Sequence, residues 1–261
     1  MSLRLSTLWP RAPRDAGSGR PQLVYLPGMD GTGDLIRPQL SGLTARVDVQ
    51  AVSIPPDDCS SWDSLRAQMV DLLTAGNRFA RRAPRILCGE SFGACLALQV
   101  AASHPELIDA LILINPASSA MGQPWIRWGA DLVSSLPRAI YGLSAAALLP
   151  FLIAQHRVSP ANQRALLQAM RSVQPRSAAW RLSLLADFSA RQLPLERIEQ
   201  PVLLLASGAD RLLPSVAEAA ALSQRFRRAS TVQLPGSGHA CLLERKIRLG
   251  ALVNEHAVAL A

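Results

Sequence analysis

The sequence predicts an α/β fold in which a mostly parallel, doubly wound sheet carries an inserted helical segment. Short apolar runs of strand length alternate with helix-length segments up to residue 119, as is typical of a parallel sheet covered on both faces. This rhythm stops over residues 120–197, which have helical periodicity, and it resumes in two further strands over residues 198–261. With 261 residues, of which 49% are hydrophobic, the chain is long enough to bury such a core.

The composition restricts the kind of protein that this can be. With 18% charged residues and its high apolar content, the chain is predicted to fold. The net charge of +8 comes almost entirely from arginine, because Lys246 is the only lysine. No dense basic run with interleaved aromatic residues occurs, so we do not expect binding to nucleic acid. A cationic surface helps a protein to meet anionic lipid headgroups, although an ordinary solvated surface is the simpler interpretation.

The cysteines and the N-terminal residues bear on the compartment. Cys59, Cys88, Cys95 and Cys241 have no CxxC spacing, and we interpret them as reduced residues of a cytosol-like compartment. Residues 1–20 lack the apolar run of a secretory signal and are predicted to form a flexible tail, with a weak transit-like leader as the alternative. No stretch reaches the roughly 18 uninterrupted apolar residues of a membrane span. These features predict a cytoplasmic protein whose membrane contact is at most peripheral.

The first part of the core is expected to cover residues 21–119. Its predicted strands are residues 22–26, 47–54, 86–88 and 108–114, and its predicted helices are residues 34–43, 61–75 and 94–102. Ser61 is a suitable N-cap for the second helix, and apolar residues share one face of that helix, namely Leu65, Met69, Leu72 and Leu73. The last of these strands is almost entirely apolar, as expected of a central parallel strand that is buried on both faces.

A glycine-rich loop follows the first predicted strand. It reads Pro27-Gly28-Met29-Asp30-Gly31-Thr32-Gly33, and its three glycines let backbone N–H groups come close to a ligand. In α/β-hydrolases the loop in this place supplies one of two oxyanion donors, and here the donor would be the N–H of Met29, the residue after Gly28. The alternative is a phosphate-binding loop, but the pattern is neither G-x-G-x-x-G nor a Walker A motif.

A serine lies between the third predicted strand and the helix that follows it. The residues Gly89-Glu90-Ser91-Phe92-Gly93 match Gly-x-Ser-x-Gly, the pattern of a nucleophile elbow, in which a strained turn exposes the serine hydroxyl. A side chain at Gly89 or Gly93 would crowd the backbone of this turn. The N–H of Phe92 would be the second oxyanion donor, at the positive end of the helix dipole. The alternative is a small-residue turn without chemistry.

Residues 120–197 are predicted to form a helical cap inserted before the last two strands. Large side chains recur in this segment, among them Trp125, Trp128, Tyr141, Phe151 and Trp180. Residues 139–154 are nearly all apolar, yet they are too few and too interrupted by proline to span a bilayer. We expect most of these side chains to form the core of the cap itself. The uncharged stretch is also expected to line an apolar substrate channel or to rest on a membrane surface.

An aspartate and a histidine follow the last two predicted strands. Asp210 comes shortly after the apolar run 201–206, where its alternative role is that of an Asx turn or a helix cap. His239 lies in a glycine loop after residues 230–234, and no other histidine has this setting. The order Ser91, Asp210, His239 is that of the α/β-hydrolases and differs from the orders in chymotrypsin and subtilisin. The sequence therefore predicts an α/β-hydrolase fold with these three residues as a catalytic triad.

Several motifs taken together are typical of one family. They are Leu26-Pro27-Gly28-Met29-Asp30-Gly31-Thr32-Gly33, Gly89-Glu90-Ser91-Phe92-Gly93-Ala94-Cys95-Leu96-Ala97-Leu98, Asn115-Pro116-Ala117-Ser118, Ala206-Ser207-Gly208-Ala209-Asp210, Leu213-Pro214-Ser215, Gly238-His239-Ala240 and Leu242-Leu243-Glu244. In these motifs the chain resembles the α/β-hydrolase domain of the phytyl ester synthase/diacylglycerol acyltransferase family of plastids and cyanobacteria. The resemblance implies acyl transfer to or from lipid-type alcohols such as phytol or diacylglycerol, with acyl-CoA, acyl carrier protein or galactolipid as donor. Plant members carry a second, acyltransferase-like domain, whereas this chain resembles a single-domain form, so simple ester hydrolysis stays open.

The residues predict two-step covalent catalysis that requires no metal or cofactor. His239 would take the proton of Ser91, which attacks the carbonyl of an apolar acyl ester or thioester, while Asp210 orients the imidazole. The acyl-Ser91 intermediate would then pass to water or to a long-chain alcohol. Two other classes stay open, namely a lyase or cofactor-free oxygenase with the same three residues and a non-catalytic lipid-binding module.

Overall fold

A computed structural model gives the fold and describes residues 2–8, 20–75, 83–118 and 138–256, together with residues 129 and 133. In this described part of the chain, seven strands form one sheet in the order β1-β3-β2-β4-β5-β6-β7. The strands are β1 (Arg4–Thr7), β2 (Gln22–Leu26), β3 (Asp48–Ser53), β4 (Arg85–Glu90), β5 (Ala110–Ile114), β6 (Val202–Ser207) and β7 (Ala229–Leu234). Every pair of neighbours is parallel except β1 and β3. The predicted α/β-hydrolase fold with a mostly parallel sheet is confirmed.

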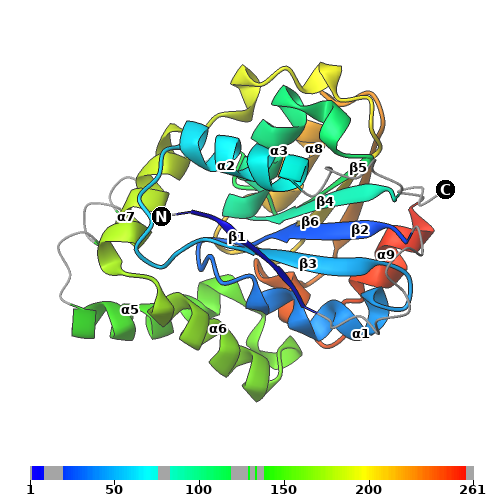
Figure 1. Cartoon of the computed structure of the whole chain (residues 1–261). Helices are drawn as coiled ribbons and strands as arrows, with labels where there is room; N and C mark the ends of the chain where they lie inside the picture. Colours follow the sequence, from blue (N-terminus) through cyan, green and yellow to red (C-terminus); the bar gives the residue numbers. More distant parts are fainter. Residues whose placement is uncertain are drawn as a thin grey trace.

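Helices cover both faces of this sheet (Figure 1). The α-helices are α1 (Leu40–Leu43), α2 (Trp62–Ala75), α3 (Phe92–Ser103), α5 (Arg138–Leu152), α6 (Pro160–Ser172), α7 (Pro175–Asp187), α8 (Ser215–Ser223) and α9 (Leu249–Glu255). Short 3-10 turns are η2 (Asp34–Gln39), η3 (Pro105–Leu107), η5 (Gln155–Arg157), η6 (Ala190–Gln192), η7 (Leu195–Arg197) and η8 (Cys241–Leu243). Helices α2, α3 and α8 pack on one face, and α1 and α9 pack on the other.

The central strands β4, β5 and β6 are buried along their whole length. Because side chains alternate along a strand, each of these strands contributes to two separate hydrophobic clusters. Leu87, Leu111 and Leu204 belong to the cluster under α2 and α3. Ile86 and Ile112 belong to the cluster under α1 and α9. This burial on both faces explains why the strands read as continuous apolar runs in the sequence.

The expectation of a flexible tail over residues 1–20 is wrong for its first residues. Residues 4–7 form strand β1, which pairs antiparallel with β3 from Arg4 opposite Ser53 to Thr7 opposite Gln50. Their side chains are mostly exposed, so no hydrophobic alternation marks the strand in the sequence. The gain comes from backbone hydrogen bonds along an edge of β3 that would otherwise be unpaired. Residues 9–19 lie outside the described residues.

The segment 34–43 was expected to be one helix, and the structure divides it into two pieces. The first is the 3-10 turn η2, which contains Pro38, and the second is the single α-helical turn α1. Proline has no N–H and its ring clashes with the carbonyl four residues earlier, which disfavours a regular α-helix here. Helix α2 agrees with its prediction, and the N–H of Ser64 donates to Oγ of the cap residue Ser61 at 3.3 Å.

Helices α5, α6 and α7 lie between β5 and β6 in the chain and sit together at one end of the sheet (Figure 1). Leu149 and Leu152 of α5 pack on a cluster that includes Leu166 of α6. The opposite side of α5 is exposed, at Ile140, Leu143, Leu148 and Phe151. Of the large side chains expected to form the cap's own core, Leu148, Phe151 and Trp180 are exposed instead. Trp125 and Trp128 lie outside the described residues.

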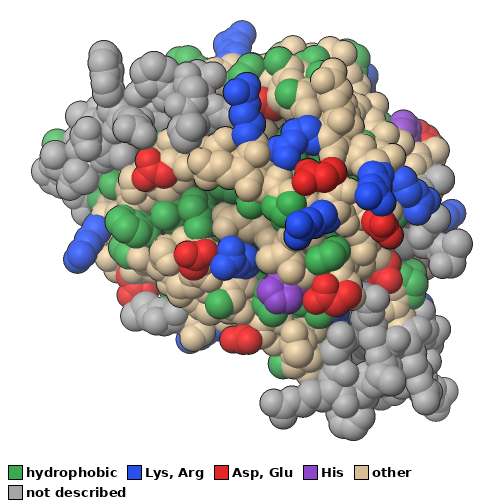
Figure 2. Space-filling view, turned by 90° about the horizontal axis from the view of Figure 1, so that it is seen from above, with side chains coloured by type: hydrophobic (Ala, Val, Ile, Leu, Met, Phe, Trp, Pro, Cys, Tyr) green, Lys and Arg blue, Asp and Glu red, His purple; other side chains and the backbone are tan. Residues whose placement is uncertain are grey.

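Charges of both signs are interspersed on the face of the described residues that is visible in Figure 2. Arginine side chains alternate there with aspartate and glutamate side chains, and no large area of one sign is visible. This arrangement fits the solvated surface expected from the composition. Within the same described residues, no helix combines the length and the apolar character needed to cross a membrane.

Candidate active site

Ser91 occupies a strained turn between β4 and α3. Its backbone has φ 53° and ψ −113°, a conformation that costs an L-residue on the order of 1–3 kcal/mol. A Cβ atom on Gly89 would lie 2.5 Å from the carbonyl oxygen of Gly93, and one on Gly93 would lie 2.2 Å from that of Leu26. Both distances are far shorter than real contacts, so the turn requires glycine on each side of the serine.

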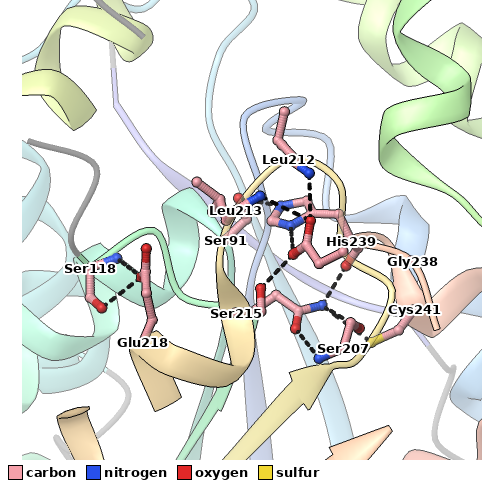
Figure 3. A network of polar contacts seen from close by, with 12 residues as sticks. Ser91, Ser118, Ser207, Leu212, Leu213, Ser215, Glu218, Gly238, His239 and Cys241 are labelled. Atoms are coloured by element: carbon pink, nitrogen blue, oxygen red, sulfur yellow. Dashed lines mark hydrogen bonds and ion pairs between the residues drawn. The ribbon is translucent and has the colours of Figure 1, made fainter. Parts of the chain in front are cut away.

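Asp210 and His239 reach the same place from the ends of β6 and β7. The hydroxyl of Ser91 donates to Nε2 of His239 with Oγ and Nε2 2.9 Å apart, and Nδ1 of His239 donates to Oδ2 of Asp210 at 2.7 Å. This assignment follows because a carboxylate can only accept. Figure 3 shows the imidazole of His239 between Ser91 and the loop after β6. The structure thus brings together the three residues that the sequence predicted to act together.

The carboxylate of Asp210 is held from both of its oxygens. Oδ1 accepts from the N–H groups of Leu212 and Leu213 at 2.8 and 3.0 Å, while Oδ2 also accepts from the hydroxyl of Ser215. Burial alone raises the pKa of Asp210, but the charge of His239 and these hydrogen bonds lower it overall. Asp210 therefore makes an Asx-type turn and orients His239 at the same time, although the two roles stood as alternatives in the sequence.

The pKa of His239 is set by opposing influences. Burial, the largest of them, lowers this pKa, whereas the charge and hydrogen bond of Asp210 raise it, as do the charges of Glu90 and Glu218. The acidic groups prevail, and the pKa lies above the ordinary value of 6.5. Glu218 on α8 is itself buried and accepts from the N–H and the hydroxyl of Ser118, both at 2.8 Å (Figure 3).

The two backbone amides expected to form an oxyanion hole have fixed orientations. The carbonyl of Ser91, in the same peptide as the Phe92 N–H, accepts from the N–H of Ala94 at 3.0 Å. As the first residue of α3, Phe92 has no acceptor within its own helix. The carbonyl of Gly28, in the same peptide as the Met29 N–H, accepts from the N–H of Gly31 at 3.0 Å. The hydrogen bond that each carbonyl accepts fixes the plane of its peptide. Because the N–H of a trans peptide points opposite to the carbonyl, each of the two amide N–H groups points away from that hydrogen bond.

The loop after β2 requires glycine at Gly31 and Gly33 but not at Gly28. Gly31 and Gly33 have positive φ values of 68° and 74°, which favour glycine strongly. Gly28 is not required sterically, since a Cβ atom there would meet nothing closer than Oδ1 of Asp30 at 3.6 Å. That added atom would lie 3.8 Å from Cβ of Ser91, so Gly28 borders the space beside the nucleophile.

Glu90 is a feature of the site that the sequence analysis did not single out. It is the variable residue between Gly89 and Ser91, it is buried, and it accepts a short hydrogen bond from the hydroxyl of Tyr25. Burial raises the pKa of Glu90 to about 7, although Tyr25 and the charge of His239 lower it in part. Its position in the sequence could have predicted this burial, because Glu90 is the last residue of a buried central strand.

Asn115 and Glu244 also support the site, and both were quoted above only as parts of family motifs. Asn115 directly follows β5 and has a positive φ of 43°. Its Nδ2 donates to the carbonyl oxygen of His239 at 2.6 Å, and its Oδ1 accepts from the N–H of Ser207 at 2.8 Å. Glu244 accepts from the N–H of Gly238, the residue before His239, at 2.8 Å. The histidine loop is therefore held by two buried side chains from different elements.

A cavity of about 580 Å³ lies behind the glycine loop and not at Ser91. Its walls include Asp30, Gly31 and Thr32 from the glycine loop, Pro55 from the loop after β3, and Ser172 from α6. None of the three aligned residues lines it, so we do not assign the reacting group to this cavity. In the described part of the chain, no three His, Cys, Asp or Glu side chains gather in a way that could hold a metal ion.

The seven-stranded sheet, the serine turn and the aligned histidine and aspartate define the α/β-hydrolase class. The chain belongs to the alpha/beta hydrolase family, whose pattern it matches over residues 13–248. It is 31% identical over 257 residues to phytyl ester synthase 1, chloroplastic, of Arabidopsis thaliana, covering 90% of this chain and 36% of that protein. This similarity confirms the resemblance expected from the motifs. The chain thus spans about a third of the length of that relative.

Two further similarities concern esterases. The chain is 26% identical over 183 residues to pimeloyl-[acyl-carrier protein] methyl ester esterase of Aromatoleum aromaticum, covering 65% of this chain and 72% of that protein. The solved structure of the esterase EaEST from Exiguobacterium antarcticum superimposes with a TM-score of 0.80 at 15% identity, covering 97% of this chain and 95% of that chain. The structural likeness shows the fold. Both sequence relatives are named for enzymes whose substrates or products are esters.

Proposed function

We propose that this chain is a serine-dependent carboxylic ester hydrolase or acyltransferase that acts through an acyl-Ser91 intermediate. The observation that carries the proposal is the unbroken hydrogen-bonded line from Ser91 Oγ to His239 Nε2, at 2.9 Å, and from His239 Nδ1 to Asp210, at 2.7 Å. A hydroxyl becomes a useful nucleophile when a base lies within hydrogen-bond reach and a third group orients that base. Both conditions are met at one end of the sheet.

In the first step, His239 Nε2 takes the proton of Ser91 as Oγ attacks the carbonyl carbon of an ester or thioester. The carbonyl π electrons move to its oxygen, and Met29 N–H and Phe92 N–H stabilise the resulting oxyanion, at about 3 kcal/mol per donor. The intermediate collapses and expels the alcohol or thiol, which receives the proton from His239. Asp210 stays ionised throughout and stabilises the imidazolium.

In the second step, an acceptor hydroxyl gives its proton to His239 and attacks the acyl-serine carbonyl. Water as the acceptor yields a free carboxylic acid, and a long-chain alcohol yields a new ester. Expulsion of Ser91 Oγ, reprotonated by His239, restores the enzyme. Hydrolysis and transfer therefore share every residue of the site and differ only in which acceptor reaches the acyl-enzyme.

For the substrate, we propose an apolar, lipid-type acyl ester or thioester with a long-chain alcohol as an acceptor. One relative is named for the synthesis of phytyl esters, and the other for the hydrolysis of a pimeloyl-[acyl-carrier protein] methyl ester. The exposed apolar side of α5, with Leu143 and Phe151 among its side chains, fits peripheral contact with a lipid surface. The four cysteines are free thiols, which fits a cytoplasmic location.

The experiment that tests the proposal is a measurement of product partition. The purified protein is given p-nitrophenyl esters of several chain lengths, an acyl-CoA and a galactolipid, each with and without phytol, and the products are identified by mass spectrometry. We expect acyl products from the wild type and none from Ser91→Ala, while Ser64→Ala, an exposed serine on α2, behaves as wild type. Fatty acid alone identifies a hydrolase, and a Ser91-dependent phytyl ester identifies a transferase.

The same experiment addresses the alternative classes. A lyase or oxygenase of this fold would release no p-nitrophenol in a burst proportional to enzyme, whereas an acyl-enzyme mechanism predicts such a burst when the second step is slow. A lipid-binding module would bind the galactolipid equally well before and after Ser91→Ala and would release no product. Ester turnover that survives the loss of the Ser91 hydroxyl would overturn the proposal.

A further inference from the structure

A buried arginine connects the cap to the loop that carries the Met29 amide. Arg181 lies on α7, within the segment inserted between β5 and β6, and only 2% of it is exposed. Its Nη1 donates to the carbonyl oxygen of Met29 at 2.6 Å, and its Nη2 donates to the carbonyl oxygen of Pro55 at 2.8 Å. One guanidinium thus joins α7 to two loops that leave the carboxyl ends of β2 and β3.

The hydrogen bond to Met29 acts on a tight turn. Gly28, Met29, Asp30 and Gly31 form a turn closed by the hydrogen bond from the Gly31 N–H to the Gly28 carbonyl. The Met29 carbonyl belongs to the central peptide of this turn, which is the peptide that rotates when a turn changes type. With Gly28 held by Gly31 and Met29 held by Arg181, the peptides on both sides of Met29 are fixed. Its N–H therefore keeps one direction.

The loop is shaped around the guanidinium. A Cβ atom on Gly31 would lie 2.8 Å from Nη1 of Arg181, so a larger residue there would displace the arginine. Burial of the charge lowers the pKa of Arg181, and the charges of Asp30 and Asp58 raise it in part. A buried guanidinium is expensive to retain without such partners. Two carbonyl acceptors and two nearby acidic groups compensate for that cost at this position.

We infer that Arg181 is a positioning residue that holds the Met29 amide in place as an oxyanion donor and so couples the cap to the chemistry. The inference rests on the proposed function, in which the Met29 N–H stabilises the oxyanion. An oxyanion donor acts on charge that develops only in the transition state. Loss of Arg181 should therefore lower kcat and leave KM for a short-chain ester nearly unchanged, because such a substrate makes little use of the cap.

The experiment compares four variants by steady-state kinetics on a short-chain p-nitrophenyl ester, with active sites counted by titration with a p-nitrophenyl phosphonate. Arg181→Met removes both hydrogen bonds, and Arg181→Lys keeps the charge but lacks the planar fork that reaches two carbonyls. Arg181→Ala leaves space for guanidinium ion added to the assay. Arg176→Met is the matched control, an exposed arginine near the start of the same helix.

We expect kcat per titrated site to fall about tenfold to a hundredfold in Arg181→Met, below the loss of about 10² to 10³ reported for deleting an oxyanion donor outright. Arg181→Lys should recover part of this loss, and millimolar guanidinium should raise kcat of Arg181→Ala while methylammonium does not. Arg176→Met should match wild type within twofold. Unfolding temperatures measured beside the kinetics identify any variant that is only less stable.

The inference is overturned if titrated sites of Arg181→Met and Arg181→Lys keep the wild-type kcat, or if guanidinium restores the unfolding temperature of Arg181→Ala without restoring kcat. A failure of the proposed function looks different. In that case wild-type ester turnover does not depend on Ser91, and the phosphonate titrates no site in any variant. The two failures are therefore read from separate measurements.

Discussion

The side-chain amide of Asn115 donates a 2.6 Å hydrogen bond to the backbone carbonyl of His239, which lies 124 positions further along the chain. The same amide donates to Oγ of Ser207 at 2.9 Å, and its oxygen accepts from the N–H of Ser207. Asn115 is completely buried. One side chain therefore ties the end of β5 to the end of β6 and to the loop that presents the proposed base.

Replacing Asn115 should cost both stability and activity. Asn115→Gly leaves the buried carbonyl of His239 and the N–H of Ser207 without their partner, at about 1–3 kcal/mol for each unsatisfied group. Asn115→Ala should cost more than Asn115→Gly, because the φ of 43° disfavours a residue with a Cβ. Urea unfolding measures both changes in the free energy of unfolding. Equal stability of the two variants would contradict the strain argument, and wild-type stability of both would contradict the hydrogen-bond argument.

The pH dependence of activity should reflect the environment of His239. The proposed base must be neutral, so kcat/KM should fall tenfold per pH unit below its pKa. Because that pKa is raised above 6.5, the midpoint of the acid limb should lie above pH 6.5. The bound proton stabilises the folded state at low pH, and this contribution is lost as the pH rises through the folded pKa. In Glu90→Gln the midpoint should move down, because Glu90 is one of the charges that raise the pKa.

Glu90 should make its own contribution to the pH dependence of stability. Its pKa is raised from 4.5 to about 7 in the folded protein, so between these values the folded state holds a proton that the unfolded chain has lost. Stability should therefore decrease as the pH rises through this window, by about 3 kcal/mol at about 1.4 kcal/mol per unit. Glu90→Gln, which can still accept from Tyr25, removes this decrease. If the free energy of unfolding depended on pH in the same way in wild type and variant from pH 4.5 to 8, the burial argument would be contradicted.

Replacing the glycines near Ser91 by alanine should change the free energy of unfolding by very different amounts. Gly93→Ala places a Cβ atom 2.2 Å from the carbonyl oxygen of Leu26 and should lower the free energy of unfolding by about 3 kcal/mol or more, if the protein folds at all. Gly28→Ala meets only ordinary contacts and should stay within about 1 kcal/mol of wild type. Gly42 is the matched control, because nothing lies within 4 Å of its added Cβ. Thermal unfolding of the three variants gives the order directly.

Local pattern was sufficient to predict much of the site. Ser91 and Asp210 follow buried strands whose apolar runs are visible in the sequence, whereas His239 follows the more exposed strand β7. Parallel strands bring their carboxyl ends to one edge. Contacts between distant segments were not predictable in this way. From the sequence, Arg181 would be predicted to be a solvated charge on an amphipathic helix, because no nearby residue indicates its contact with Met29, 152 positions earlier. Strand β1 was missed for the same reason, since its pairing with β3 depends on backbone geometry.

Besides the contact of Arg181 with Met29, the segment inserted between β5 and β6 also contacts the loop that carries His239. The carboxylate of Glu244, whose side chain is 1% exposed, forms an ion pair with Arg157 of η5, which is 26% exposed. The same carboxylate accepts from the hydroxyl of Ser237 at 3.0 Å and from the N–H of Gly238 at 2.8 Å. A Cβ atom on Gly238 would lie 2.7 Å from the N atom of Ala154, so the loop before His239 is clamped between the inserted segment and Glu244.

Glu244→Gln should therefore be costlier than loss of its partner. The amide presents an NH₂ group where the carboxylate accepted from Arg157 Nε, and it removes the charge of the ion pair, which should lower the free energy of unfolding by about 3 kcal/mol. Arg157→Met should cost less, because Glu244 keeps two hydrogen bonds and Arg157 is partly in solvent. The exposed pair Arg227–Glu199, with side chains 62% and 74% exposed, is the matched control, and Glu199→Gln should change stability by less than about 1 kcal/mol. A double-mutant cycle on Arg157 and Glu244 that gives no coupling energy would show that the ion pair does not hold the loop, whereas coupling above about 1 kcal/mol supports the clamp.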